Sequence, residues 1–136
     1  MRPEPEIAAW AHMLVRRRMS DLQRVQRKAK KHWGGGKYVH KLRTQARRLR
    51  AAVEDLRACI SNAQKLIDES KNLGQKTGKV RDAEVLLRRL QRYRVFAFPA
   101  ERAEIDALCK PLKKQRKAAQ KPAKACVRDF RAKMPS

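Results

Sequence analysis

The chain has 136 residues, which is enough for one domain and too few for two of ordinary size. Its 36 lysine and arginine residues outnumber 13 acidic residues, so the formal net charge is +23 and pairing can neutralise only a minority of the basic side chains. A neutral small-molecule partner would not explain this excess, which favours a polyanion such as nucleic acid, an anionic membrane surface or inorganic polyphosphate.

Helical periodicity runs through the chain without an alternating β pattern, so the sequence predicts an all-α fold, an antiparallel bundle of about four to five helices. The first helix should span about residues 4–30, and the glycines at 34–36 should end it in a turn. Its core-facing side chains should be Ile7, Trp10 or Ala11, Leu14, Leu22, Val25 and Ala29.

The second helix should run from residue 37 to about residue 60, with two distinct faces at 100° per residue. The core face should carry Leu42, Ala46, Leu49, Val53, Leu56 and Ile60. The opposite face should carry His40, Arg43, Arg47 and Arg50, with Arg48 to one side.

Gly74 predicts the end of a third helix over about residues 62–73, and Thr77 is a plausible N-cap for a fourth over about residues 78–94. The third helix should bury Leu66, Ile67 and Leu73. The fourth should gather Ala83, Leu86, Leu87, Leu90 and Tyr93 on one side and Arg81, Arg88 and Arg92 on the other. A last helical stretch should begin near Glu101, and Pro111 and Pro122 should kink or break it.

The glycine-rich segment does not fit a nucleotide P-loop, because Lys37 is followed by Tyr38 rather than Ser or Thr and no strand precedes it. The first amides of the following helix are better placed to meet an anion, with His40 and Arg43 beside them. Arg47 and Arg50 continue this face at intervals of about 5.4 Å, a spacing suited to a linear polyanion. The alternative is a basic helix whose face is simply solvated.

Two motifs stand in order along the chain: H-x-x-R at His40 and Arg43 followed by R-R-L-R at 47–50, and V-R-D-A-E-V at 80–85. A looser V-R-D-F follows at 127–130. Together they resemble the CHAD family, the conserved histidine α-helical domain, over roughly residues 38–130. Glu84 stands where that family usually has aspartate, and the chain matches only the N-terminal half of an architecture of two pseudo-symmetric helical bundles.

The resemblance implies a non-catalytic module that binds inorganic polyphosphate along a basic surface. It implies no catalytic residue, metal or cofactor. The residues expected to bind polyphosphate are His40, Lys41, Arg43, Arg47, Arg48, Arg50, Arg81, Arg88 and Arg92. Asp82, in the first turn of the expected fourth helix, should complement the helix dipole and orient an arginine. The missing half predicts a homodimer.

The second hypothesis is a helical nucleic-acid-binding protein, which would compete for the same charge. Aromatic residues make up 5% of the chain, which leaves little surface for stacking unpaired bases. Cys59, Cys109 and Cys126 are isolated and odd in number, which favours free, buried or half-buried thiols. The apolar run at 7–15 is too short to span a bilayer, so we expect a protein that is not inserted in a membrane. The chain length predicts one domain over 1–136, and the isolated cysteines indicate the cytoplasm. Association with polyphosphate granules is what the CHAD resemblance implies.

Overall fold

The computed structural model describes residues 4–33 and 36–131, so Gly34 and Gly35 of the predicted turn lie outside the described residues. The described ranges contain four α-helices, one short 3-10 helix and no strand, which confirms the all-α prediction. The elements are α1 (Pro5–Lys31), α2 (Lys37–Asp55), the 3-10 helix η1 (Arg57–Cys59), α3 (Ala63–Phe96) and α4 (Pro99–Asp129).

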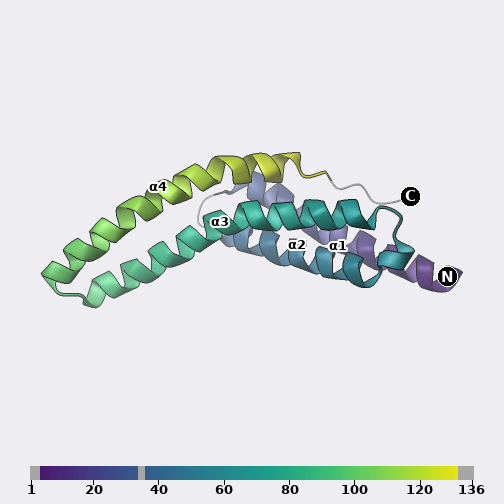
Figure 1. The fold of residues 1–136 in the computed structure, drawn as a ribbon, viewed down its shortest axis with the longest axis horizontal. Helices are drawn as coiled ribbons and strands as arrows, with labels where there is room; N and C mark the ends of the chain where they lie inside the picture. The colour runs from purple at the N-terminus through teal and green to yellow at the C-terminus, as the bar shows by residue number, and fades with distance from the viewer. Residues whose placement is uncertain (1–3, 34–35, 132–136) are drawn as a thin grey trace.

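The helices pack as successive antiparallel neighbours, with α1 against α2, α2 against α3 and α3 against α4 (Figure 1). Contacts between α1 and α4 close the arrangement into a bundle. Figure 1 shows that α3 and α4 continue beyond the start of α2 as a two-helix hairpin. The turn of this hairpin lies at the end of the molecule opposite the N-terminus.

The core side of α2 is the one that periodicity predicts. Leu42, Ala46, Leu49 and Val53 are buried, and Leu56 packs half-buried against the same cluster. On α1 the prediction is partly wrong. A stripe through Ala11, Val15, Met19, Leu22, Gln26 and Ala29 is buried. Ile7 and Trp10 are exposed, because α1 meets α2 along the stripe that starts at Ala11.

Gln26 is a polar residue within this buried stripe, and its contacts explain its position. Its Nε2 donates hydrogen bonds to the backbone oxygens of Val127 at 2.6 Å and Phe130 at 2.8 Å. These oxygens belong to the last turn of α4 and its C-cap, where helix carbonyls lack partners within the helix. Gln26 therefore ties the end of α4 to α1.

The predicted break between two helices at Gly74 is wrong, because α3 is continuous from Ala63 to Phe96. Thr77 does not cap a helix: it is buried inside α3, and its hydroxyl donates to the Leu73 carbonyl at 2.7 Å. Two interior glycines cost the helix about 1 kcal/mol each. Burial of Leu73, Thr77 and Val80 between them and beside them outweighs that cost.

Two other helix ends also differ from expectation. The second helix ends at Asp55 rather than near residue 60, although Ile60 is still buried. The last helix begins at Pro99 and runs through Pro111 and Pro122 without a break. Figure 1 shows α4 as a curved helix, consistent with the backbone hydrogen bond that each proline removes.

The cysteines are free, as predicted, with Cys109 buried and Cys59 and Cys126 half-buried. Burial raises the pKa of the Cys126 thiol above its ordinary value. Of the apolar face predicted for residues 83–93, Ala83 and Leu87 are buried, whereas Leu86 and Tyr93 are exposed. The other helices therefore cover only part of that apolar face.

Candidate polyanion-binding groove

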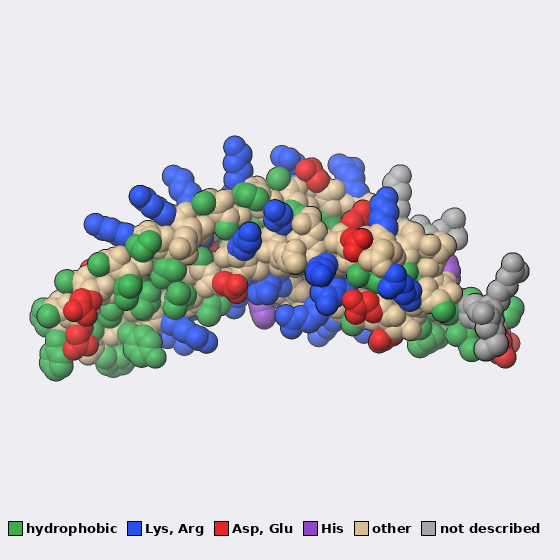
Figure 2. Space-filling view, in the orientation of Figure 1, with side chains coloured by type: hydrophobic (Ala, Val, Ile, Leu, Met, Phe, Trp, Pro, Cys, Tyr) green, Lys and Arg blue, Asp and Glu red, His purple; other side chains and the backbone are tan. Residues whose placement is uncertain are grey.

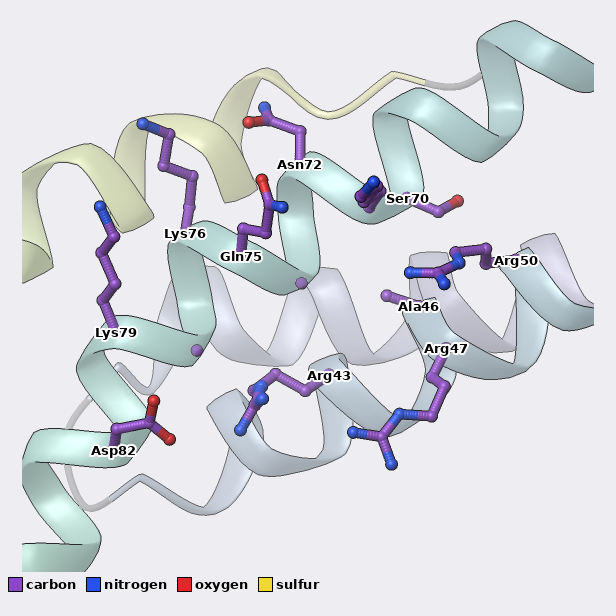
Figure 3. A pocket seen from close by; sticks show the side chains of 13 residues that line it. Arg43, Ala46, Arg47, Arg50, Ser70, Asn72, Gln75, Lys76, Lys79 and Asp82 are labelled. Carbon is purple, nitrogen blue, oxygen red and sulfur yellow. The ribbon is translucent and has the colours of Figure 1, made fainter.

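A groove with a volume of about 570 Å³ lies between α2 and α3 (Figure 3). We call it the α2–α3 groove. Its basic lining residues are Arg43, Arg47 and Arg50 from α2 and Lys71, Lys76 and Lys79 from α3. One carboxylate, that of Asp82, also lines it. Figure 2 shows lysine and arginine side chains gathered over this middle part of the molecule.

The groove exists because small residues line its floor. Ser70, Gly74 and Gly78 recur every four residues on α3 and so share one face, opposite Ala46 of α2. A Cβ on Gly74 would meet nothing within 4 Å, so the space there is open. A Cβ on Gly78 would lie 3.3 Å from Nη2 of Arg43, so the guanidinium of Arg43 rests directly over α3.

The charges lining the groove are largely uncompensated. Among the described residues, Arg50 is the one groove cation that forms an ion pair, with its Nε 3.1 Å from Oε1 of Glu54. Both partners are about half exposed, at 44% and 46%, so solvent screens the pair and it contributes little. Five cations and one carboxylate therefore remain to set the local potential, which attracts anions.

The predicted α2 residues do not all reach the groove. Arg43, Arg47 and Arg50 line it, as their shared face predicts. His40, Lys41 and Arg48 are exposed on α2 but are not among the lining residues. The structure thus separates the predicted set into three groove residues and three flanking ones.

The predicted α3 arginines lie outside the groove. Arg81 is half-buried near the start of α2, with Nη1 3.4 Å from where a Cβ on Gly36 would stand. Arg88 borders a separate small hollow that also includes Arg116, and Arg92 is exposed. At 100° per residue, these three fall within about 40° of Gly74, so they continue the groove face of α3 beyond α2. We call them the arginine row; Arg92 lies about 21 Å along α3 from Gly78.

The sequence reading missed Lys71, Lys76 and Lys79, which supply the α3 side of the groove. In Figure 3, Lys76 and Lys79 extend from α3 toward α4, so they form the rim of the groove farther from α2. A continuous helical wheel across Gly74 places Lys71 about 60° from that glycine, on the side facing the groove. The prediction of two separate helices on either side of Gly74 gives no such relation between Lys71 and the residues that follow.

The start of α2 is less open to an anion than its sequence predicts. Gly36, the N-cap residue, is buried and has a φ of 72°, a conformation that favours glycine. A Cβ there would collide with the Glu84 carboxylate, so an acidic group of the protein already lies against this helix start. The guanidinium of Arg81 also lies close to this position, so a phosphate at the first amides of α2 would meet a carboxylate as well as a cation.

Asp82 does not complement a helix dipole, which was one part of its predicted role; that it orients an arginine stays a prediction. It lies in the middle of α3, far from either end, so its carboxylate cannot complement a helix N-terminus. It instead contributes negative charge at one end of the groove. No cluster of three or more His, Cys, Asp or Glu side chains that could hold a metal occurs in the described ranges. None of the helices described is both long and apolar enough to cross a membrane.

A family model for the CHAD domain matches residues 16–134, which includes both sequence motifs and every residue of the groove. No curated protein and no solved structure was found to match the chain. The family match agrees with the all-helical fold and with the basic groove between the helices that carry the motifs. The chain therefore belongs to the CHAD domain family.

Proposed function

We propose that this protein is a non-catalytic module that binds inorganic polyphosphate in the α2–α3 groove. CHAD domains as a family are associated with polyphosphate binding. The observation that carries the proposal for this chain is the set of six basic side chains, from two helices, that line one groove with a single carboxylate. Such a concentration of charge favours a ligand with a phosphate at every repeat.

The groove also suits the shape of a polyphosphate chain. Arg43, Arg47 and Arg50 follow one another along α2 at about one helical turn, and each guanidinium presents paired donors to phosphate oxygens. The arginine row would carry the chain onward along α3, past the start of α2. Affinity would come from Coulomb attraction and counterion release, so it should fall steeply with salt.

A binding role rather than hydrolysis fits the lining of the groove. Asp82 is its one acidic lining residue, and no histidine stands beside it there to make a general acid and base pair. His40 lies one turn from Arg43 on the exposed side of α2. We propose that it contacts bound phosphate next to the groove.

The test is binding of long-chain polyphosphate and of duplex DNA at equal phosphate concentration across a salt series. We expect polyphosphate to bind more tightly than DNA. Arg43→Glu with Arg47→Glu should lower polyphosphate affinity at least about 100-fold, because each reversal removes an attraction and adds a repulsion.

The matched control is Arg17→Glu with Arg24→Glu, which changes the net charge equally on exposed positions of α1. These residues do not line the groove, so the control should lose only the smaller, long-range part of the affinity. Equal losses for the two double variants would contradict the groove as the binding site. Displacement of polyphosphate by DNA would favour the nucleic-acid-binding alternative.

We further propose that residues 1–136 form one domain, that two copies associate, and that the protein resides in the cytoplasm on polyphosphate granules. Residence on granules follows from affinity for the polymer. Association of two copies has support from the exposed apolar surface of the α3–α4 hairpin, which leaves the groove free.

A further inference from the structure

The end of the α3–α4 hairpin exposes large apolar side chains to an unusual degree. Phe96 is 91% exposed, Phe98 is 74% and Tyr93 is 69%. Leu86 and Leu108, one on each helix, are 44% and 56% exposed. Figure 2 shows hydrophobic side chains gathered at the hairpin end of the molecule, with acidic side chains beside them.

The exposed area is large for a monomer. Aromatic side chains present about 150–250 Å² each, so Tyr93, Phe96 and Phe98 alone expose on the order of 450 Å². With the two leucines the surface reaches roughly 600 Å², at the upper end of the largest patches found on monomers. It approaches the ~800 Å² that each partner buries in an interface of standard size.

The charge of this end differs from that of the remaining chain. Residues 93–108 hold two basic and three acidic residues, whereas the whole chain carries a net charge of +23. Two copies would repel one another at almost any basic face, but this segment has a net charge of −1, from two positive and three negative side chains. A second copy can therefore approach here at little electrostatic cost.

The hairpin end is also held in shape. Nε of Arg94 donates to Oδ1 of Asp106 at 2.8 Å, which links α3 to α4 near the turn. Nε of Arg102 donates to the Ala97 carbonyl at 3.1 Å. The apolar side chains are thus presented on an ordered pair of helices. Glu101 and Glu104 are exposed and, among the described residues, form no ion pair, so they can meet arginines of another copy.

Leu86 and Tyr93 are on a different side of α3 from the groove. At 100° per residue, they fall about 100–120° from Gly74, whereas the arginine row and Phe96 fall within about 40° of it. Phe96 is the last residue of α3 and lies about 27 Å along the helix from Gly78. A partner seated on the hairpin end would therefore leave the groove accessible and would lie next to the Arg92 end of the arginine row.

We propose that the α3–α4 hairpin end is a self-association surface, on which a second copy of this chain docks hairpin to hairpin in a two-fold dimer. A two-fold contact places the same apolar patch on both sides and closes the assembly. This inference gives the proposed dimer its interface, and it needs no ligand. It can therefore fail while polyphosphate binding stands, and the reverse is equally true.

The experiment is light scattering and sedimentation equilibrium of the full chain without polyphosphate. Phe96→Ser with Phe98→Ser should raise the dimer dissociation constant at least about 100-fold, because aromatic anchors dominate interface energies. Both side chains are so exposed that their loss should leave the helical content unchanged. Affinity for polyphosphate per chain should change less than about three-fold, since neither residue lines the groove.

Trp10→Ser with Met13→Ser is the matched control, because these large apolar residues of α1 are also exposed, at 52% and 63%, and lie far from the hairpin end along the molecule. The control should leave the dimer intact. Any of three results would overturn the proposal: a wild-type monomer at all concentrations, a dimer that survives loss of both phenylalanines, or open-ended oligomers that the control abolishes. Binding of the monomer to anionic lipid vesicles through the two phenylalanines would assign the surface to membranes instead.

Discussion

Gly74 and Gly78 lie on the same face of α3 but have different surroundings. Substitution of the first should affect mainly the stability of the helix, and substitution of the second should also affect ligand binding. Gly74 faces open space in the groove, whereas Gly78 lies under the guanidinium of Arg43. Neither has a positive φ. Alanine is therefore compatible with the backbone at both positions, but it has room only at Gly74.

Gly74→Ala should stabilise the protein by about 0.5–1 kcal/mol, because alanine favours the helix and meets no neighbour. Gly78→Ala should give less stabilisation and should weaken polyphosphate binding several-fold, since its methyl group displaces Arg43. Thermal unfolding and a binding titration of the two variants measure both effects. A larger loss of affinity for Gly74→Ala than for Gly78→Ala would contradict the position assigned to Arg43.

At the scale of the elements, α3 and α4 are tied together near their turn by Arg94 and Asp106. The hydrogen bond from Arg94 lowers the pKa of Asp106 below its ordinary value of 3.8. A carboxyl group whose pKa is lowered by folding adds stability at pH values above its ordinary pKa. That stability is lost as the pH falls through the lower pKa of the folded state.

Replacement of Asp106 by Asn should therefore reduce stability at neutral pH, and the difference from wild type should shrink as the pH falls below about 4. Both side chains are about half exposed, so the effect should be small and should weaken further with salt. Chemical denaturation of both proteins from neutral to acidic pH measures it. A difference that grows on acidification would show that the sign assigned here is wrong.

For the whole molecule, the net charge of +23 predicts opposite effects of added salt on two quantities. The unfolding temperature of the ligand-free protein should rise, and the affinity for polyphosphate should fall. Added salt screens repulsion among the basic residues, so the ligand-free protein should unfold at a higher temperature in about 0.5 M salt than in about 0.05 M. The same screening should weaken polyphosphate binding.

Polyphosphate at about 100 times its dissociation constant should stabilise the folded state by about 2.7 kcal/mol. That gain should shrink with salt if the total ligand concentration is kept constant. Thermal scans with and without polyphosphate at both salt concentrations test the two trends together. If salt lowered the unfolding temperature of the ligand-free protein, self-repulsion would not be what limits its stability.

Features confined to one helix could be predicted from residue order. A helical turn of 3.6 residues predicts the apolar side of α2 and the common face of Arg43, Arg47 and Arg50. The packing of α2 in the bundle matches both predictions. The CHAD resemblance could also be recognised from its motifs, because they are local in sequence. The all-helical class followed from composition and periodicity together.

Features that depend on a neighbour could not be predicted in this way. Gly74 favours a helix end locally, but in α3 it lies between the buried residues Leu73 and Thr77, so tertiary packing outweighs its local preference. The position of α2 along α3 decides which α3 cations line the groove. Lys71 lies beside α2 and lines the groove, whereas Arg88 lies beyond the start of α2 and does not. The exposure of Leu86 and Tyr93 could not be predicted for the same reason. A helical wheel shows which side chains share a face, but it does not show whether another helix covers that face.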